Sequence, residues 1–173
     1  MELNLVLFEP EIPQNTANIM RTCVATNTIL HLIEPLGFSL SDKYINRASA
    51  NHAKLAKYFV YKNFDDFFEK NQGTFCYLTR YGQKNFYDFK IQTDQPNEKY
   101  YFVLGKESTG IPYDVLRRDL DKCYRIPMAS DVRSLNLAST AAVVLFEAHR
   151  QIGFPELSLY EPENFKGKNF LIE

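Results

Sequence analysis

The chain has 173 residues and a mass of 20.1 kDa, a length that fits one domain. Hydrophobic residues make up 45% of it and aromatic residues 14%, so it can bury a substantial core, and disordered, collagen-like and coiled-coil classes are excluded. Its 20 Lys and Arg against 21 Asp and Glu give a net charge of −1, which excludes a uniformly basic nucleic-acid-binding coat but not a local basic patch.

Short β-branched and aromatic runs alternate with helical patterns along most of the chain. Strands are expected at 3–8, 29–34, 75–79, 100–105 and 123–126, and helices at 15–26, 65–70, 112–119 and 136–152. This alternation predicts an α/β fold with a mainly parallel sheet and helices on both faces. We expect residues 1–154 to form a single domain, and residues 155–173, which lack periodicity, to form a C-terminal tail.

The expected helix at 136–152 is apolar on nearly every face. Such a helix either lies deep in a sheet sandwich or meets another subunit. In a single small domain this pattern favours a homodimer.

Cysteine usage and the N-terminal sequence bear on the compartment. Three cysteines without CxxC spacing argue against a disulfide framework and against a thiolate zinc site, so no metal is expected. The start of the chain is acidic and lacks the basic region of a signal peptide, and no uncharged apolar run approaches the roughly 20 residues that span a bilayer. We therefore expect a cytoplasmic protein without a membrane segment.

Several nucleotide-binding and catalytic motifs are excluded. Gly105 and Gly110 have the spacing of a phosphate-binding loop, but Ile111 and Pro112 occupy the positions that need Lys and Ser or Thr. No GxGxxG follows the first strand, so the usual dinucleotide fingerprint is missing. The three histidines are scattered, without metal or triad spacing, and each is expected to be structural.

The segment PEIPQNTANIMR, residues 10–21, directly follows the first strand. Its prolines keep the loop extended, and either Asn15 or Thr16 is expected to cap the next helix. Capping gives no role to Arg21. Because ligands of open α/β sheets bind at the carboxyl ends of strands, this loop is a candidate site.

Two further segments have the same character. Residues 101–112 run from a buried strand into a turn where Gly105 permits close approach of a ligand or of backbone; the segment is either a tight connection or a binding loop. Residues 125–139 lead into the apolar helix, which Ser134 or Asn136 can cap. A cap needs one residue, so the additional polar side chains of Asp131 and Arg133 indicate more than capping.

Taken together, the three segments resemble the three motifs of the SPOUT superfamily of knotted RNA methyltransferases. PEIPxNTxNIxR, GxExxGIP and RIPMxxDxRSLNLxSTAAVVLFEAxRQ are similar to the signatures of its small tRNA wobble-nucleotide 2′-O-methyltransferases, over residues 3–154. The chain departs from that subgroup at Ala17, where glycine is usual, and in the residues that flank Glu107.

The resemblance implies a fold with a deep C-terminal trefoil knot. It also implies S-adenosylmethionine as cofactor, a homodimer whose active site draws on both subunits, and methylation of the ribose 2′-hydroxyl of a wobble pyrimidine in a tRNA anticodon stem-loop. By motif position, the cofactor-binding residues would be Leu78, Gly105, Ile126, Ser134, Leu135 and Asn136, with Thr79 a weaker candidate. The catalytic residues facing the ribose would be Asn15, Arg21, Glu107 and Asn136.

Two chemical roles stay open for Arg21. Family mechanisms assign the withdrawal of the hydroxyl proton to the arginine of the first motif. A guanidinium, with a pKa of roughly 12 or more, is normally always protonated, which favours stabilisation of alkoxide charge and a phosphate contact.

A basic stretch, residues 43–62, contains no acidic residue. By itself it fits a solvated helical face equally well. Beside the resemblance it is the leading RNA phosphate-binding surface. Its candidate contacts are Lys43, Arg47, Lys54 and Lys57.

Two other functions compete with tRNA methylation. One is a sister methyltransferase that acts on ribosomal RNA; such relatives commonly carry an extra N-terminal domain, for which a first strand beginning at residue 3 leaves no space. The other is an RNA-binding dimer without catalysis, against which the intact motif residues argue.

Overall fold

A computed structural model of the chain describes residues 1–41 and 55–172. Its strands are β1 (Glu2–Phe8), β2 (Ile29–Ile33), β3 (Tyr58–Tyr61), β4 (Thr74–Leu78), β5 (Lys84–Asn85), β6 (Lys99–Leu104) and β7 (Cys123–Arg125). Its α-helices are α1 (Pro13–Ala25), α3 (Phe64–Lys70), α4 (Tyr113–Arg118) and α5 (Leu137–Ile152), with short 3-10 helices η2 (Phe86–Asp88) and η3 (Leu120–Lys122).

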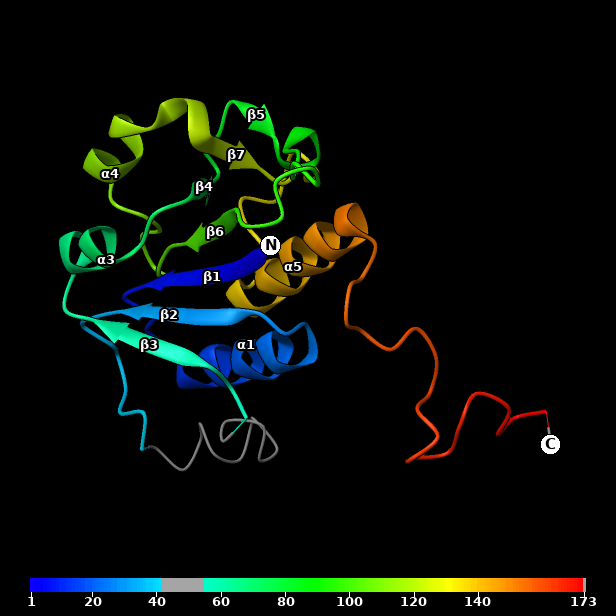
Figure 1. Cartoon of the computed structure of the whole chain (residues 1–173). Coiled ribbons are helices and arrows are strands. Elements are labelled where there is room, and N and C mark those ends of the chain that lie inside the picture. The colour runs from blue at the N-terminus through cyan, green and yellow to red at the C-terminus, as the bar shows by residue number, and fades with distance from the viewer. Residues whose placement is uncertain (42–54, 173) are drawn as a thin grey trace.

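The seven strands form one sheet in the order β3-β2-β1-β6-β4-β7-β5 (Figure 1). All pairings between these strands are parallel; in the centre, Leu5 of β1 pairs with Leu30 of β2 on one side and Phe102 of β6 on the other. The expected α/β fold with a parallel sheet is confirmed. Parallel strands place all their carboxyl ends at one edge, where the loops that follow β1, β4 and β6 meet.

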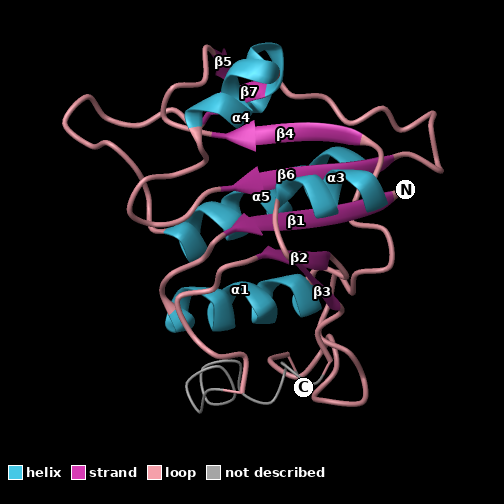
Figure 2. Cartoon of the chain, turned by 90° about the vertical axis from the view of Figure 1, so that its left-hand side faces the viewer, coloured by secondary structure: helices cyan, strands magenta, loops and turns pink. Residues whose placement is uncertain are grey.

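Helices cover both faces of the sheet, with α1 and α5 on one side and α3 and α4 on the other (Figures 1 and 2). Successive residues of β1 point to opposite faces: Leu5 and Leu7 enter the core beneath α1 and α5, whereas Val6 and Phe8 enter the core beneath α3 and α4. This double burial explains why the strands are continuous apolar runs.

Helix α5 packs one side of its apolar sequence into the core, as the first interpretation expected, whereas its contact with another subunit stays a prediction. Ala141, Val144, Leu145 and Ala148 are buried against the sheet and α1. Phe146, on another side of the same helix, is 48% exposed. One face is therefore committed to the core, and an apolar side chain is left on the outer face.

The two histidines that the structure describes are buried in the cores. His31 contacts the Tyr61 hydroxyl through Nδ1 and the Asn4 Oδ1 through Nε2, both at 2.9 Å, and burial lowers its pKa to about 4. His149 Nε2 donates to the Thr26 carbonyl at 2.8 Å. Both are structural, as expected.

Strands β3 and β5 were not predicted. Tyr58, Phe59 and Val60 of β3 are exposed at the edge of the sheet. They fall in the basic stretch 43–62, for which a solvated helical face was one of two interpretations, and at these residues the structure has a strand instead. Strand β5 has only two residues. It lies on the far side of β7 from β4, so residues 79–83 cross from one flank of β7 to the other. The C-terminal knot stays a prediction.

After α5 the chain continues to residue 172 in turns, without a helix or strand, and leads away from the sheet (Figure 1). Several of its apolar side chains are exposed, among them Leu159, Phe165 and Leu171. Within residues 1–41 and 55–172, none of the helices has the length and apolar character to cross a membrane.

Candidate active site

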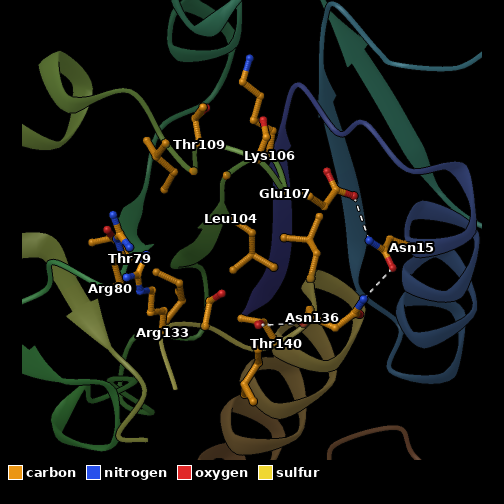
Figure 3. A pocket seen from close by; sticks show the side chains of 18 of the residues that line it. Asn15, Thr79, Arg80, Leu104, Lys106, Glu107, Thr109, Arg133, Asn136 and Thr140 are labelled. Carbon is orange, nitrogen blue, oxygen red and sulfur yellow. Dashed lines mark hydrogen bonds between the residues drawn. The ribbon is translucent and has the colours of Figure 1, made fainter. Parts of the chain in front are cut away.

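A cavity of about 610 Å³ lies where the loops after β4 and β6 meet the N-termini of α1 and α5 (Figure 3). Its size is that of a typical cofactor pocket. The predicted site residues that line it are Leu78, Gly105, Ser134, Leu135 and Asn136, together with Thr79, Asn15 and Glu107. Ile126 lines a smaller cavity of about 90 Å³ that shares Leu78, Ser134 and Leu135 with the first.

Gly105 is required by the backbone of its own loop. A Cβ at this position would lie 2.1 Å from the Ile111 nitrogen and 2.2 Å from the Gly110 carbonyl carbon, far inside van der Waals contact. The loop folds back on itself through a hydrogen bond from the Gly110 N–H to the Lys106 carbonyl at 2.9 Å. Of the two possibilities for Gly105, close approach of backbone is the one that the structure contains.

The expected cap of α1 is wrong. Ile12 is the N-cap residue and offers no side-chain acceptor, Pro13 opens the helix, and Asn15 and Thr16 are buried inside its first turn. An acceptor comes instead from the loop after β6. The Glu107 carboxylate accepts hydrogen bonds from the N–H of Glu11 at 2.9 Å and of Ile12 at 3.3 Å. A carboxylate at this end of α1 also complements the helix dipole.

The same two loops are cross-linked at further points. Lys106 forms an ion pair with Glu9 at 2.8 Å. The Glu11 carboxylate accepts from the Ser108 N–H at 2.9 Å and from the Ser108 hydroxyl at 2.8 Å, and these hydrogen bonds lower the pKa of Glu11. We call the loops at 9–12 and 106–108, with their mutual contacts, the clamped wall of the pocket.

A chain of side-chain hydrogen bonds extends the clamped wall to α5 (Figure 3). Asn136 Nδ2 donates to Asn15 Oδ1 at 3.0 Å, and Asn15 Nδ2 donates to Glu107 Oε1 at 3.0 Å. Asn136 Oδ1 accepts from the N–H of Ala138 and of Ser139, so Asn136, and not Ser134, caps α5. Because N–H donors fix one end of the chain and a carboxylate fixes the other, both amides have one allowed orientation.

On the opposite side of the pocket Arg80, Tyr81 and Tyr113 were not predicted, whereas Thr79 was a weaker candidate and Arg133 was expected to do more than support a helix cap. The sequence Thr79-Arg80-Tyr81 follows β4 directly, and Arg80 and Tyr81 line the cavity together with Tyr113 and Arg133. Their place in the sequence could have indicated Arg80 and Tyr81 as site residues. They directly follow a strand of a parallel sheet, and ligands of such sheets bind at the carboxyl ends of the strands.

Arg21 and the predicted phosphate contacts lie elsewhere. Arg21 is exposed on α1 and is not part of the cavity lining; six residues after Asn15, it lies roughly 240° around the helix and about 9 Å along it. Lys57 is exposed beside β3. Lys43, Arg47 and Lys54 lie outside the described residues.

The lining suits a ligand with an apolar ring and a charged, polar tail. Leu78, Leu104 and Leu135 offer apolar surface, while the loop after β6 offers backbone groups, and Ser134 and Thr140 offer hydroxyls. This combination matches the purine, ribose and amino-acid parts of S-adenosylmethionine.

Comparison with known proteins gives the same picture. The SpoU rRNA Methylase family matches residues 2–146. A protein of Geobacillus stearothermophilus, provisionally named tRNA (cytidine(34)-2′-O)-methyltransferase, is 47% identical over 161 residues, which cover 91% of this chain and 100% of that protein.

Two solved structures extend the comparison to the fold. One, concerned with the 2-OH methylation of C/U34 on tRNA, superimposes with a TM-score of 0.81 at 36% identity and covers 88% of this chain and 97% of that one. An AdoMet-bound rRNA methyltransferase from Sinorhizobium meliloti has a TM-score of 0.76 at 23% identity, over 87% of this chain and 57% of that one, and shares the fold.

Proposed function

This chain belongs to the SpoU rRNA methylase family, and from that premise we propose that it methylates the ribose 2′-hydroxyl of nucleotide 34, a cytidine or uridine, in tRNA. The observation that carries the proposal is the chain of hydrogen bonds that joins Glu107 of the clamped wall to Asn15 and Asn136, one residue from each motif, along a cofactor-sized pocket. Relatives with the same activity in their names match nearly the whole chain.

S-adenosylmethionine, the proposed cofactor, supplies an electrophilic methyl group on a sulfonium sulfur. The residues that would hold it are Leu78, Gly105, Ser134, Leu135 and Asn136 of the larger cavity and Ile126 of the smaller one. Since the loop around Gly105 is shaped by its own backbone contacts, this part of the pocket exists before any ligand binds.

The proposed role of Glu107 is to position the site. The two oxygens of its carboxylate accept from the N–H groups of Glu11 and Ile12 and from the Asn15 side chain, so it fixes the N-terminus of α1 against the pocket. Asn15 and Asn136 are held by the same chain of hydrogen bonds. Each amide would offer its second Nδ2 hydrogen to the ribose.

Arg21 is the proposed charge-stabilising residue, although it does not line the pocket of its own chain. A second copy would have to supply it, which is one reason to propose a homodimer whose active sites draw on both subunits. The exposed Phe146 on α5 and the exposed apolar side chains of the tail, such as Leu159, offer surface for that contact. A guanidinium stays protonated, so it would stabilise the developing alkoxide or hold a phosphate.

The main test is methyl transfer itself. Purified protein is incubated with labelled S-adenosylmethionine and either total tRNA or ribosomal RNA from cells that lack it, and the product is mapped by nuclease digestion and mass spectrometry. We expect label on the ribose of nucleotide 34. Ribosomal RNA is included because the family description names it. Label only there would refute the tRNA proposal, and binding without transfer would favour a non-catalytic RNA-binding protein.

An Arg21→Ala variant tests the assignment of that residue. We expect methyl transfer to fall about a hundred- to a thousand-fold, the scale of one lost charge-stabilising donor, while cofactor affinity stays as in the parent. Calorimetry with S-adenosylmethionine measures the second quantity. Lost cofactor binding in a folded variant would contradict the assignment.

We propose that the protein acts in the cytoplasm. That compartment contains tRNA and keeps thiols reduced, and the three cysteines of the protein are buried free thiols.

A further inference from the structure

Four exposed residues form a group at the mouth of the pocket, opposite the clamped wall. We call Arg80, Tyr81, Tyr113 and Arg117 the tyrosine rim. Tyr81 and Tyr113 line the cavity, and each is 51% exposed. Large aromatic side chains on a pocket edge, half in solvent, are neither core residues nor part of the hydrogen-bonded clamp, so their position needs another explanation.

The rim is ordered by its own contacts. The rings of Tyr81 and Tyr113 meet edge to face with centroids 5.5 Å apart, and their hydroxyls lie 3.0 Å from each other. The Arg80 guanidinium lies 4.6 Å from the Tyr81 ring centroid and also bonds its hydroxyl, while Arg117 lies 5.9 Å from the Tyr113 ring. Hydrogen bonds from Tyr113 and Arg80 lower the pKa of Tyr81.

The charge on this side of the pocket is positive. In the part of the chain that the structure describes, Arg80, Arg117 and Arg133 form no ion pair with a carboxylate, although Arg118 beside them pairs with Asp114 at 3.8 Å. On the clamped wall, by contrast, Lys106 is neutralised by Glu9. Exposed guanidinium groups without partners can bind phosphates.

Flat aromatic faces beside unpaired arginines are the combination that binds single-stranded RNA. Unstacked bases stack on tyrosine rings and guanidinium planes, and the adjoining phosphates contact the arginines. We propose that the tyrosine rim stacks against a nucleobase of the RNA loop, adjacent to the nucleotide whose ribose enters the pocket. The inference rests on the proposed function, since it takes an RNA loop as the substrate.

The placement gives the rim a defined task. The target ribose must reach the cavity between the clamped wall and the rim, so its neighbours in the strand pass over the pocket mouth. A base that stacks on Tyr81 or Tyr113 would be unstacked from the other bases of the loop. This contact would hold the neighbouring ribose over the cavity. The rim would thus contribute affinity for the loop and select its conformation.

The first experiment measures two affinities for each of two variants, Tyr113→Ala and Tyr81→Ala. An anticodon stem-loop RNA carrying a fluorescent label reports RNA binding by anisotropy, and calorimetry with S-adenosylmethionine reports cofactor binding. We expect RNA binding to weaken about fivefold or more in each variant, and cofactor affinity to stay as in the parent. Tyr113→Phe keeps the ring and should recover most of the loss. Tyr87→Ala removes a tyrosine that lies outside the pocket and is 42% exposed, close to the 51% of the rim tyrosines, and it is the matched control.

The second experiment identifies the base. Each loop nucleotide in turn is replaced by an abasic ribose, and the penalty is measured for the parent protein and for Tyr113→Ala and Tyr81→Ala. If a rim tyrosine stacks on a particular base, removing that base lowers the affinity of the parent protein for the RNA. The variant that lacks this tyrosine should bind the intact and the abasic RNA equally well. We expect such a loss of the abasic penalty at one position beside nucleotide 34.

Two results would overturn the inference. Loss of cofactor affinity with unchanged RNA affinity would make the rim part of the cofactor site. Abasic penalties that persist unchanged in both variants at every position would exclude stacking. The proposed function fails separately. If the abasic penalty is lost in a rim variant but the parent protein transfers no methyl group to nucleotide 34, the stacking inference stands and the substrate assignment is wrong.

Discussion

The two sides of the pocket are built in opposite ways. On the clamped wall, Glu107 accepts from backbone and side-chain donors, Asn15 and Asn136 continue the chain, and Lys106 is paired with Glu9. On the tyrosine rim, aromatic rings are half exposed and arginines have no carboxylate partner among the described residues. A wall whose polar groups are already hydrogen-bonded within the protein can hold a fixed geometry. A wall with exposed aromatic rings and unpaired guanidinium groups can bind a ligand such as RNA.

Among the variants that test the contrast between the two walls, the largest effect is expected from Glu107→Ala, which removes the centre of the clamped wall. Three N–H groups lose their charged acceptor, so the free energy of unfolding should drop by about 2 kcal/mol. Methyl transfer should fall about a hundred-fold, because small displacements of an assembled site are costly. Denaturant unfolding and single-turnover methylation measure the two quantities.

Glu107→Gln is the matched variant, since it keeps one oxygen acceptor and should recover part of both losses. The pair of readouts separates positioning from direct contact with the ribose. Lost activity with parental stability would show that Glu107 acts on the substrate alone and would remove the contrast between the two walls.

The link from the clamped wall to α5 is tested at Asn136, which both caps the helix and bonds Asn15. Asn136→Ala should cost about 1 kcal/mol of unfolding free energy through the lost cap. Asn136→Ser keeps a capping oxygen but is too short to bond Asn15, so it should retain most of that stability and still lose methyl transfer. Equal activity of the Ser variant and the parent protein would show that the Asn15 contact has no function.

The contrast also marks the limit of prediction from sequence. Buried runs such as 3–8 and 100–105 identify their strands because alternate side chains enter two cores, and the parallel order follows from the intervening helices. Since strands of such a sheet end at one edge, the motifs at 10–21, 101–112 and 125–139 could be placed together before their contacts were known.

The contacts themselves depend on residues far apart in sequence. Ile12 is an unexpected N-cap because the acceptor for its N–H belongs to Glu107, 95 residues away. Local capping rules compare neighbours and therefore favoured Asn15 or Thr16. The Asn15 side chain is instead engaged with Glu107 and Asn136. The rim joins Tyr81 to Tyr113 across 32 residues, and neither residue has a local pattern that marks the other.

A smaller effect is expected at Ser134, which lines both cavities. Because Asn136 caps α5 and Ser134 is exposed, Ser134→Ala should leave the free energy of unfolding within about 0.5 kcal/mol of the parent. Cofactor binding should weaken by about 1 kcal/mol, the scale of one hydrogen bond. Calorimetry with S-adenosylmethionine decides, and an unchanged dissociation constant would remove Ser134 from the cofactor site.

The smallest effect is expected from acid, which should weaken the clamped wall and leave the arginines of the rim charged. Hydrogen bonds from Ser108 hold the pKa of Glu11 below its ordinary value of 4.5, so the folded state favours the ionised carboxylate. The stabilisation from this contact is therefore complete above about pH 4.5 and is lost as the pH falls through the lower pKa of the folded state. Glu11→Gln cannot ionise and isolates this contribution from those of the other carboxylates. The stability advantage of the parent protein over Glu11→Gln, measured by denaturant unfolding from neutral pH down to about pH 3, should be constant at first and then shrink. An advantage that is the same at every pH would mean that the Ser108 contact does not depend on the charge of Glu11.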